Sequence, residues 1–564
     1  MDNEISKLTI PDLLEKSFNT HADLPCMAFA GNTPLDFRTV EKKKIWLSAK
    51  LLSDNIQRGD KVAILGDNSP NWVIAYLAIT GIGAVAVPIL NGFPEADIRH
   101  IIRNSESKAI FIGDNYATKI EELEESELSI VFSLEDFTKS YLKKVKQKKL
   151  DKEVKEFIEG GKTDYDVKKL TSSFPKPVQE DLAVIIYTSG TTGHSKGVML
   201  THKNITSDVI NGLKKFPLTS DDRFLSILPL AHTFEATGGM LCPLVAGVSI
   251  FYMKGLPTPQ KLLSAMQSVQ PTGVLTVPLI VDKIYRKKIL PNIQAKKLIA
   301  FLYKLTPFRK FLNKIAGKKL ISSLGGQLRF FMFGGASLNL DVEYFLRDAK
   351  ISYSTGYGLT ETSPILTINP FGKVKVGSCG QPIPEVEIKI HNQDPETNIG
   401  EIIVRGPNIM SGYYKNPRAT EEILLSDGWL KTGDLGYMDE DGYLFIKGRS
   451  KNVIIDASGE NIYPEIIEQQ LLQNPYIQQV IVFQKNGKLI AKVYPDYDVL
   501  EEEFNCKNKN ESETADLIKR ILEEIRLEIN KNLPAYSAIS KIEEHSEPFQ
   551  LTPTNKVKRY LYID

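Results

Sequence analysis

Strand-like apolar runs alternate with helical segments along most of the chain. In the first part they lie at 61–66, 84–88 and 109–113, with helical apolar spacing at 68–80 between two of them. Parallel strands need crossover connections, usually helices, and they read as continuous apolar runs because both sheet faces are covered. The alternation resumes at 223–277. It therefore predicts an α/β fold of layered subdomains built on mostly parallel sheets.

The pattern changes towards the C-terminus, where short strands separated by turns occupy 374–446. This indicates a β-rich subdomain. After this subdomain, strand-like and helical segments alternate again, which indicates a small α+β domain. At 564 residues the chain is too long for one core. We predict a large domain over 1–448 and a small α+β domain over 449–564. The net charge of +1 gives no global electrostatic reason to expect a nucleic-acid partner.

A glycine- and hydroxyl-rich loop follows the buried run at 182–186 and leads into another apolar run at 198–200. Glycines let backbone N–H groups approach an anion, hydroxyls donate to phosphate oxygens, and a lysine supplies positive charge. The loop therefore predicts a polyphosphate site rather than an ordinary surface turn. The spacing is not that of a Walker loop, which disfavours a P-loop ATPase. The predicted ligands are Thr188, Ser189, Gly190, Thr191, Thr192, Gly193 and Lys196.

Two more strand-like runs end in glycine-containing loops. The run 329–333 leads into Gly334-Gly335-Ala336, and the run 351–354 leads into the stretch from Thr355 to Glu361. Ligands of open α/β sheets bind at the carboxyl ends of strands. We therefore expect a ligand crevice where these loops meet.

Cysteine usage and the N-terminus predict a cytoplasmic protein. The four cysteines lie far apart, no two form a C-x-x-C pair, and the first residues contain no apolar signal-like run. The uncharged stretch 73–90 contains Gly81, Gly83 and Pro88, so it predicts a helix followed by a buried strand rather than a membrane span.

The segment 283–320 differs from its surroundings, because it carries twelve basic residues, no acidic one, and interleaved leucines and phenylalanines. A basic amphipathic helix pair of this kind can lie on an anionic membrane surface. The alternative is a solvated basic face on helices that pack against the body of the protein.

Six motifs in order resemble the acyl-adenylate-forming (AMP-binding) enzymes, and the resemblance covers essentially the whole chain. They are Tyr187–Gly197, Gly334-Gly335, Tyr357–Glu361, Thr432–Asp434, Gly448-Arg449 and Lys556. The resemblance implies a ligase that uses ATP and Mg²⁺ to convert a carboxylate into an acyl-AMP, and then transfers the acyl group to the thiol of coenzyme A.

The resemblance also implies a role for each matching residue. The residues of the glycine-rich loop, Lys196 among them, would hold the phosphates, Thr360 would contact the α-phosphate, and Glu361 with Thr188 would bind Mg²⁺. Adenine and ribose would be bound by Tyr357 and Gly358, the Gly334–Ala336 backbone, Asp434 and Arg449.

The remaining matches concern the small domain and the acyl pocket. By resemblance, Lys556 bridges the carboxylate and α-phosphate, Lys451 is the hinge, and Gly459 lines the pantetheine channel. Lys558 competes with Lys556 for its role. His232 would line the acyl or adenylate pocket, although a buried, hydrogen-bonded histidine is the simpler alternative. The chain has His194-Ser195 where a proline is usual, and Asn555 where glycine is common.

Within the family, three stretches resemble the long-chain fatty acyl-CoA synthetases most: 229–235, 427–434 and 459–465. A fatty acid is therefore the predicted substrate. One alternative is a fatty acyl-AMP ligase or acyl–carrier-protein synthetase, which would use a carrier-protein thiol. The other is an acyl-nucleotide-binding regulatory protein without catalysis.

Overall fold

The computed structural model describes residues 8–124, 126–140, 171–188, 195–255, 258–456, 460–504, 511–552 and 556–563. The chain divides into two compact units. The first comprises Met1–Tyr285, Ile289–Ile388 and Val404–Leu430, and the second comprises Arg286–Lys288, Lys389–Ile403 and Lys431–Asp564. The predicted domain boundary at 448/449 lies within the second unit and stays a prediction.

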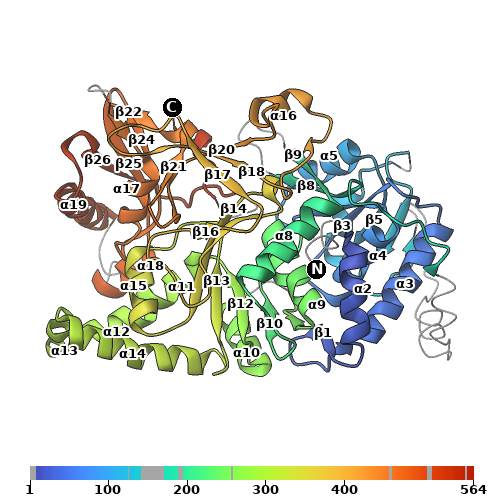
Figure 1. Ribbon diagram of the computed structural model, residues 1–564. Helices are drawn as coiled ribbons and strands as arrows, with labels where there is room; N and C mark the ends of the chain where they lie inside the picture. The colour runs from blue at the N-terminus through green and yellow to red at the C-terminus, as the bar shows by residue number, and fades with distance from the viewer. Residues whose placement is uncertain are drawn as a thin grey trace. The chain divides into compact units, whose positions relative to one another are not determined.

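The larger sheet of the first unit has nine strands, and its middle is parallel (Figure 1). Antiparallel strands close both edges: β15 (Ile365–Ile368) and β16 (Gln381–Pro382) on one side, and β2 (Leu35–Asp36) on the other. The parallel strands are, in sheet order, β14 (Tyr353–Gly358), β13 (Phe330–Phe333), β12 (Gly273–Thr276), β10 (Arg223–Ser226), β11 (Ser249–Tyr252) and β1 (Pro25–Phe29).

A second sheet of eight strands lies in the same unit, also with a parallel centre. Its order is β19-β9-β8-β4-β3-β5-β6-β7, and β9, β19 and β7 pair antiparallel at the edges. Their bounds are β19 (Gly412–Tyr413), β9 (Lys196–Thr201), β8 (Leu182–Thr188), β4 (Val85–Ile89), β3 (Lys61–Leu65), β5 (Ser107–Ile112), β6 (Ile130–Ser133) and β7 (Lys139–Ser140). The predicted α/β class with mostly parallel sheets is therefore confirmed.

Helices accompany both sheets, and several begin at a side-chain cap. The Thr9 hydroxyl accepts from the Asp12 N–H at the start of α2, and the Ser69 hydroxyl accepts from the Trp72 N–H at the start of α4. The helices are α2 (Ile10–Thr20), α3 (Phe37–Ser53), α4 (Pro70–Gly81), α5 (Glu95–Ser105), α8 (His202–Lys215), α9 (Cys242–Ala246), α10 (Pro259–Val269), α11 (Pro278–Ile284), α15 (Leu340–Asp348) and α16 (Pro417–Ile423).

The uncharged stretch 73–90 forms most of α4 and the strand β4, as predicted. Its side chains are buried almost throughout, which explains the absence of charge. Among the helices that the structure describes, none is long and apolar enough to cross a membrane.

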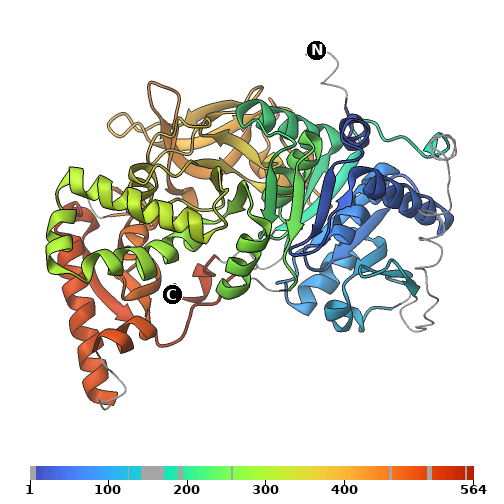
Figure 2. The same cartoon turned by 90° about the horizontal axis from the view of Figure 1, so that it is seen from below.

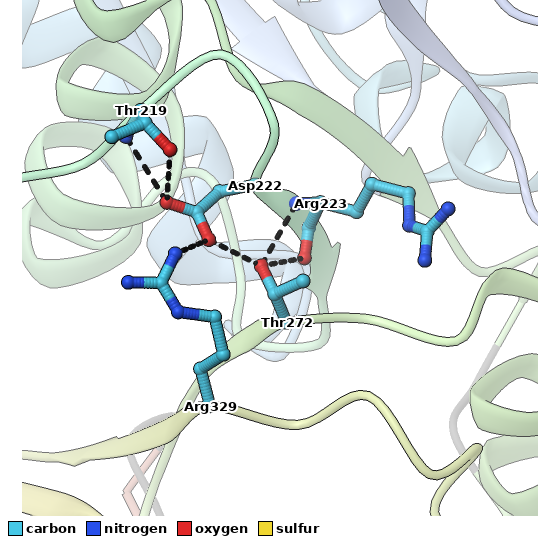
Figure 3. A network of polar contacts seen from close by, with 5 residues as sticks. All are labelled: Thr219, Asp222, Arg223, Thr272 and Arg329. Atoms are coloured by element: carbon cyan, nitrogen blue, oxygen red, sulfur yellow. Dashed lines mark hydrogen bonds and ion pairs between the residues drawn. The ribbon is translucent and has the colours of Figure 1, made fainter.

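One buried carboxylate ties together the amino ends of three neighbouring strands (Figure 3). Asp222, just before β10, accepts from Thr272 Oγ1 at 2.7 Å and from Arg329 at 2.7 Å, so it joins the segments that enter β10, β12 and β13. The side chain of Asp222 is fully buried and that of Arg329 is 47% exposed. This network lies at the strand ends opposite the loops that the sequence predicts to bind a ligand.

The basic segment forms helices on the first unit, seen at the left in both ribbon views (Figures 1 and 2). They are α12 (Leu290–Gln294), α13 (Lys297–Tyr303) and α14 (Thr306–Ser323). Gly317 lets α14 approach α15 closely, because a Cβ at this position would lie 2.6 Å from the Cβ of Ala349. One face of α14 is thereby fixed against the core.

The second unit is α+β. Most of a four-stranded sheet belongs to it, and a second sheet of three strands packs against helices around a core that includes Ile467, Val482 and Ile521. The strands are β17 (Glu387–His391), β18 (Gly400–Arg405), β20 (Leu430–Met438), β21 (Leu444–Arg449), β24 (Ile477–Lys485), β25 (Lys488–Pro495) and β26 (Ile539–Glu544), with a small pair, β22 (Ile454–Ile455) and β23 (Asn461–Ile462). The helices are α17 (Pro464–Leu471), α18 (Tyr497–Phe504) and α19 (Glu511–Asn530).

Candidate active site

The predicted phosphate loop connects two antiparallel strands, β8 and β9. Thr188 ends β8 opposite Lys196, which begins β9. The arms of this hairpin are firmly held: the Tyr187 hydroxyl donates to Asn104 at 2.6 Å, and Gly197 leaves room for the Tyr187 ring. Positions 189–194 of the loop lie outside the described residues, and these include Ser189, Gly190, Thr191, Thr192 and Gly193.

The other two glycine-containing junctions lie side by side, because β13 and β14 are parallel neighbours. Phe333 pairs with Thr355, and both loops leave the sheet at the same edge. The first loop contains Gly334, Gly335 and Ala336, and Gly335 has a φ of +81°, which favours glycine. Tyr357 and Gly358 end β14. The phosphate loop belongs to the other sheet, so the three junctions do not share one sheet edge.

Thr360 and Glu361 lie in the short 3₁₀ turn η4 (Thr360–Thr362), which a buried amide anchors. The side-chain nitrogen of Asn408 donates to the carbonyl oxygens of Thr362 at 3.0 Å and Ile365 at 2.7 Å. It also lies 3.3 Å from Asp208, whose pKa is raised by burial. Buried residues of the first unit therefore anchor the turn through hydrogen bonds.

A tyrosine joins this turn to the phosphate-loop lysine. The Tyr413 hydroxyl donates to Oε1 of Glu361 at 2.7 Å, and the Lys196 ammonium lies 4.9 Å from the centre of the Tyr413 ring. Lys196, a predicted phosphate ligand, and Glu361, which the resemblance assigns to Mg²⁺, are thus brought into one cluster.

The cluster fits a magnesium ion that is held largely by phosphate oxygens. Mg²⁺ is usually bound by one or two carboxylates together with substrate phosphates and water. Among the described residues, Oε2 of Glu361 has no hydrogen-bond partner, so one carboxylate oxygen is available. No group of three His, Cys, Asp or Glu side chains within the described ranges could hold a metal alone.

His232 precedes the π-helix η2 (Glu235–Leu241). Its Nδ1 accepts from the Phe234 N–H at 3.2 Å, and the Phe234 ring packs where a Cβ on Gly334 would lie 3.0 Å from it. Glu235 is 1% exposed and accepts from Ser226 Oγ at 2.5 Å. Burial raises the pKa of Glu235 to about 8. The segment of His232 therefore reaches the β13 junction, and the role of His232 itself stays a prediction.

The remaining predicted residues belong to the second unit. Asp434 and Arg449 are cross-strand partners on β20 and β21, and their side chains form an ion pair of 2.8 Å. Lys451 lies in the turn η5 (Ser450–Asn452). The backbone N–H of Lys556 donates to Thr552 Oγ1 at 3.1 Å, and Lys556 is exposed. Gly459 lies outside the described residues. The structure thus brings Asp434 and Arg449 together, and their role in binding ribose stays a prediction.

Residues 14–414 match the AMP-binding enzyme family, and the chain belongs to this family. The predicted family and its class of adenylate-forming enzymes are confirmed. The chain is 30% identical to the long-chain-fatty-acid–CoA ligase FadD15 of Mycobacterium bovis, over 90% of this chain and 87% of that protein. It is 32% identical to long-chain-fatty-acid–CoA ligase 5 of Mus musculus, over 94% of this chain and 85% of the relative.

Solved structures support the fold. The anthranilate CoA ligase AuaEII, in complex with anthranoyl-AMP, superimposes with a TM-score of 0.77 and covers 98% of this chain and 96% of its own, at 20% identity. At that identity the likeness concerns the fold alone.

Sequence reasoning missed Tyr413 and Asn408. Tyr413 contacts a residue 52 positions away, and Asn408 contacts Asp208 at a separation of 200. Only Gly412, before a tyrosine pair in a short apolar stretch, hinted at a constrained backbone. Neither spacing nor composition signals contacts at such separations.

Proposed function

We propose that the chain ligates a long-chain fatty acid to coenzyme A in two steps that consume ATP. The observation that carries the catalytic part is the cluster of Lys196, Tyr413 and Glu361, which sets a cation beside an available carboxylate oxygen. The choice of acid and thiol is supported by the relatives that match this chain over most of both lengths.

In the first step, a carboxylate oxygen of the acid attacks the α-phosphorus of ATP. A new O–P bond forms, the bond from the α-phosphorus to the bridging oxygen breaks, and pyrophosphate leaves. Lys196 and Thr188 hold the leaving phosphates, and Thr360 donates to the α-phosphate. Such charges, fixed before reaction, favour the transition state. Glu361 would hold Mg²⁺, which would offset the negative charge of the phosphates. Asp434 and Arg449 hold the ribose, with Tyr357 against the adenine.

In the second step, the thiol sulfur of coenzyme A attacks the acyl carbon. A C–S bond forms, the bond from the acyl carbon to the phosphate oxygen of AMP breaks, AMP leaves, and the thiol proton passes to solvent. We assign Lys556 to the first step only, where its ammonium bridges the carboxylate and α-phosphate. Lys451 is the hinge of the small domain. Rotation about it would move Lys556 away from the acyl-AMP and bring the pantetheine channel lined by Gly459 into its place.

Pyrophosphate exchange tests the function. The full chain with ATP and Mg²⁺ is assayed with acids from acetate to stearate, one aryl acid and one amino acid, and exchange is expected with the long-chain acids. Product formation is then compared between free coenzyme A and a holo-carrier protein. Transfer only to the carrier would replace this proposal with an acyl–carrier-protein synthetase. No exchange with any acid would indicate a binding protein.

The assignment of Lys556 has its own test. Lys556→Ala is expected to abolish exchange but to keep thioester formation from supplied acyl-AMP, because the lysine acts on the first transition state only. The matched control is Lys558→Ala, which changes a neighbouring lysine. Equal loss of both half-reactions in Lys556→Ala, or loss of exchange in the control, would contradict the assignment.

We also propose that α13 and α14 contact an anionic membrane surface. Six large apolar side chains on and between these helices are exposed: Leu298 (70%), Phe301 (63%), Leu305 (46%), Phe308 (46%), Phe311 (61%) and Ile315 (41%). Exposed apolar side chains that gather on one element mark an interaction surface. The absence of any acidic residue from 283–320 favours an anionic partner.

The geometry of α14 supports an in-plane orientation. Asn313, Gly317 and Leu320 are buried, and they form one face of the helix. At 3.6 residues per turn, Phe308, Phe311 and Ile315 project about 180° away from that face. Lysines 310, 314, 318 and 319 lie on either side of the stripe that these apolar side chains form. An apolar stripe bordered by lysines is the pattern of helices that lie in a membrane interface. The chain would then be a cytoplasmic enzyme, peripheral on the membrane's inner face.

Vesicle sedimentation tests this surface. The wild-type chain is expected to bind vesicles that contain phosphatidylglycerol and to be released by salt, whereas phosphatidylcholine vesicles bind it weakly. Phe308→Ser/Phe311→Ser is expected to lose binding. The control Leu527→Ser changes a comparably exposed leucine elsewhere. Equal sedimentation of the double variant and the wild type would refute the surface.

A further inference from the structure

Five consecutive residues, 410–414, reach both halves of the phosphate and magnesium cluster through their backbone. The N–H of Met410 donates to the carbonyl oxygen of Glu361 at 2.9 Å, and the N–H of Tyr414 donates to that of Gly197 at 2.7 Å. Between them, Tyr413 pairs with Val198 as β19 adds to β9. The segment therefore fixes the turn of Glu361 relative to the start of β9.

The Tyr413 side chain makes a second link between the same two elements. Tyr413 is 7% exposed. Its hydroxyl donates to Oε1 of Glu361, and the Lys196 ammonium lies over its ring. A lysine over an aromatic face is attracted by the ring, and a hydrogen bond to a carboxylate is stronger than a neutral one. One rigid side chain thus orients two opposite charges at once.

The two charges do not neutralise each other. Lys196 and Glu361 both lie within the described residues, and no ion pair joins them there. Tyr413 contacts both side chains. The ammonium consequently stays available to phosphate oxygens, and Oε2 of the carboxylate stays available to a metal ion.

We propose that Tyr413 is a positioning residue for adenylation, which holds the phosphate-binding ammonium of Lys196 and the magnesium-binding carboxylate of Glu361 at a fixed separation. This inference rests on the proposed function, because it concerns the same ATP and Mg²⁺ site. It adds a residue that touches neither reacting atom, and it predicts that hydroxyl and ring have separable effects.

Two variants separate those effects. Tyr413→Phe keeps the ring under Lys196 but removes the hydroxyl, so Oε1 of Glu361 loses its donor and the carboxylate is less well oriented. We expect the Mg²⁺ concentration for half-maximal exchange to rise about tenfold, the scale of one hydrogen bond to a charged group. Tyr413→Leu removes both contacts and is expected to raise the KM for ATP as well. Excess Mg²⁺ should restore the rate of the phenylalanine variant only.

The adjacent Tyr414→Phe is the matched control, because the Tyr414 hydroxyl bonds Glu106 at 3.3 Å, away from the cluster. Two readouts need no turnover. Calorimetric titration of Mg²⁺ into the chain with a non-hydrolysable ATP analogue should show the same weakening for Tyr413→Phe. Urea unfolding should show that Tyr413→Phe is fully folded under the assay conditions, although loss of the hydrogen bond lowers its stability, so unfolding cannot account for weaker Mg²⁺ binding.

The outcomes distinguish this inference from the function on which it rests. If the wild type fails to exchange pyrophosphate with any acid, the proposed function fails. If the wild type is active and Tyr413→Phe binds Mg²⁺ as the wild type does, the positioning role is refuted. Equal weakening in Tyr414→Phe would also refute it.

Discussion

Glu235 gives the sharpest prediction about stability and pH. It is 1% exposed, its Oε1 accepts from Ser226, and its Oε2 has no hydrogen-bond partner among the described residues. Burial without a cation disfavours the charged carboxylate, so the pKa rises from 4.5 to about 8. The folded chain consequently binds this proton more tightly than the unfolded chain does.

The sign and size of the effect follow from that difference. Between the unfolded and folded pKa values the folded state holds more protons, so the free energy of unfolding falls as pH rises. The contribution is fully present below pH 4.5 and is lost as pH rises through about 8. A difference of about 3.5 pKa units corresponds to about 5 kcal/mol at most.

Glu235→Gln removes the titration while keeping the side chain's size. Urea unfolding of both proteins is measured from about pH 5 to about pH 9. We expect similar stability at the acidic end and a variant that becomes progressively more stable than the wild type above it. Glu343, whose pKa burial raises to about 7, contributes its own slope to both proteins and cancels in the difference. The control is Glu421→Gln, which changes an exposed carboxylate. A wild-type-minus-variant difference that does not change with pH would refute the reasoning.

Three substitutions test other parts of the first unit. Asn408→Ala leaves a buried carbonyl oxygen of Thr362 and a half-buried one of Ile365 without this donor. It should lower the free energy of unfolding by about 2–6 kcal/mol and abolish exchange, whereas the exposed Asn32→Ala should change neither in urea unfolding and exchange assays. Gly358→Ala would overlap the Pro364 carbonyl oxygen, so exchange should be lost; Gly81→Ala, whose Cβ meets nothing closer than 3.8 Å, should retain it. Asp222→Ala should cost about 2–4 kcal/mol in urea unfolding but leave the KM for ATP unchanged, because it lies at the opposite strand ends; an altered KM would contradict that separation.

The local elements could be predicted because each has a local physical cause. The apolar runs that became β3, β4 and β5 are buried on both sides, and the capping residue Ser69 starts the helix that the spacing at 68–80 predicted. The hairpin around the phosphate loop was likewise visible as two apolar runs separated by glycines and hydroxyls. These signals lie within a few residues of the structure that they specify.

The partition of strands between two sheets could not be predicted. β8 and β13 read alike in the sequence, both as apolar runs that end in glycine, yet they belong to different sheets. Which strands become neighbours depends on packing over the whole unit. The same limit hid Asn408 and Tyr413, whose contacts join segments far apart in the chain. The structure supplied these pairings and contacts.

The β8–β9 hairpin has a consequence for how the phosphate loop can vary. In loops that precede a helix, an added residue turns every side chain of the helix by about 100° unless the turn absorbs it. Here both flanking strands are held by their own pairing, with Thr188 opposite Lys196 and β19 on the far side of β9. Residues can be inserted or deleted at the tip while both arms keep their register. The length and residues of the phosphate loop can therefore vary in evolution without changing the sheet that carries it.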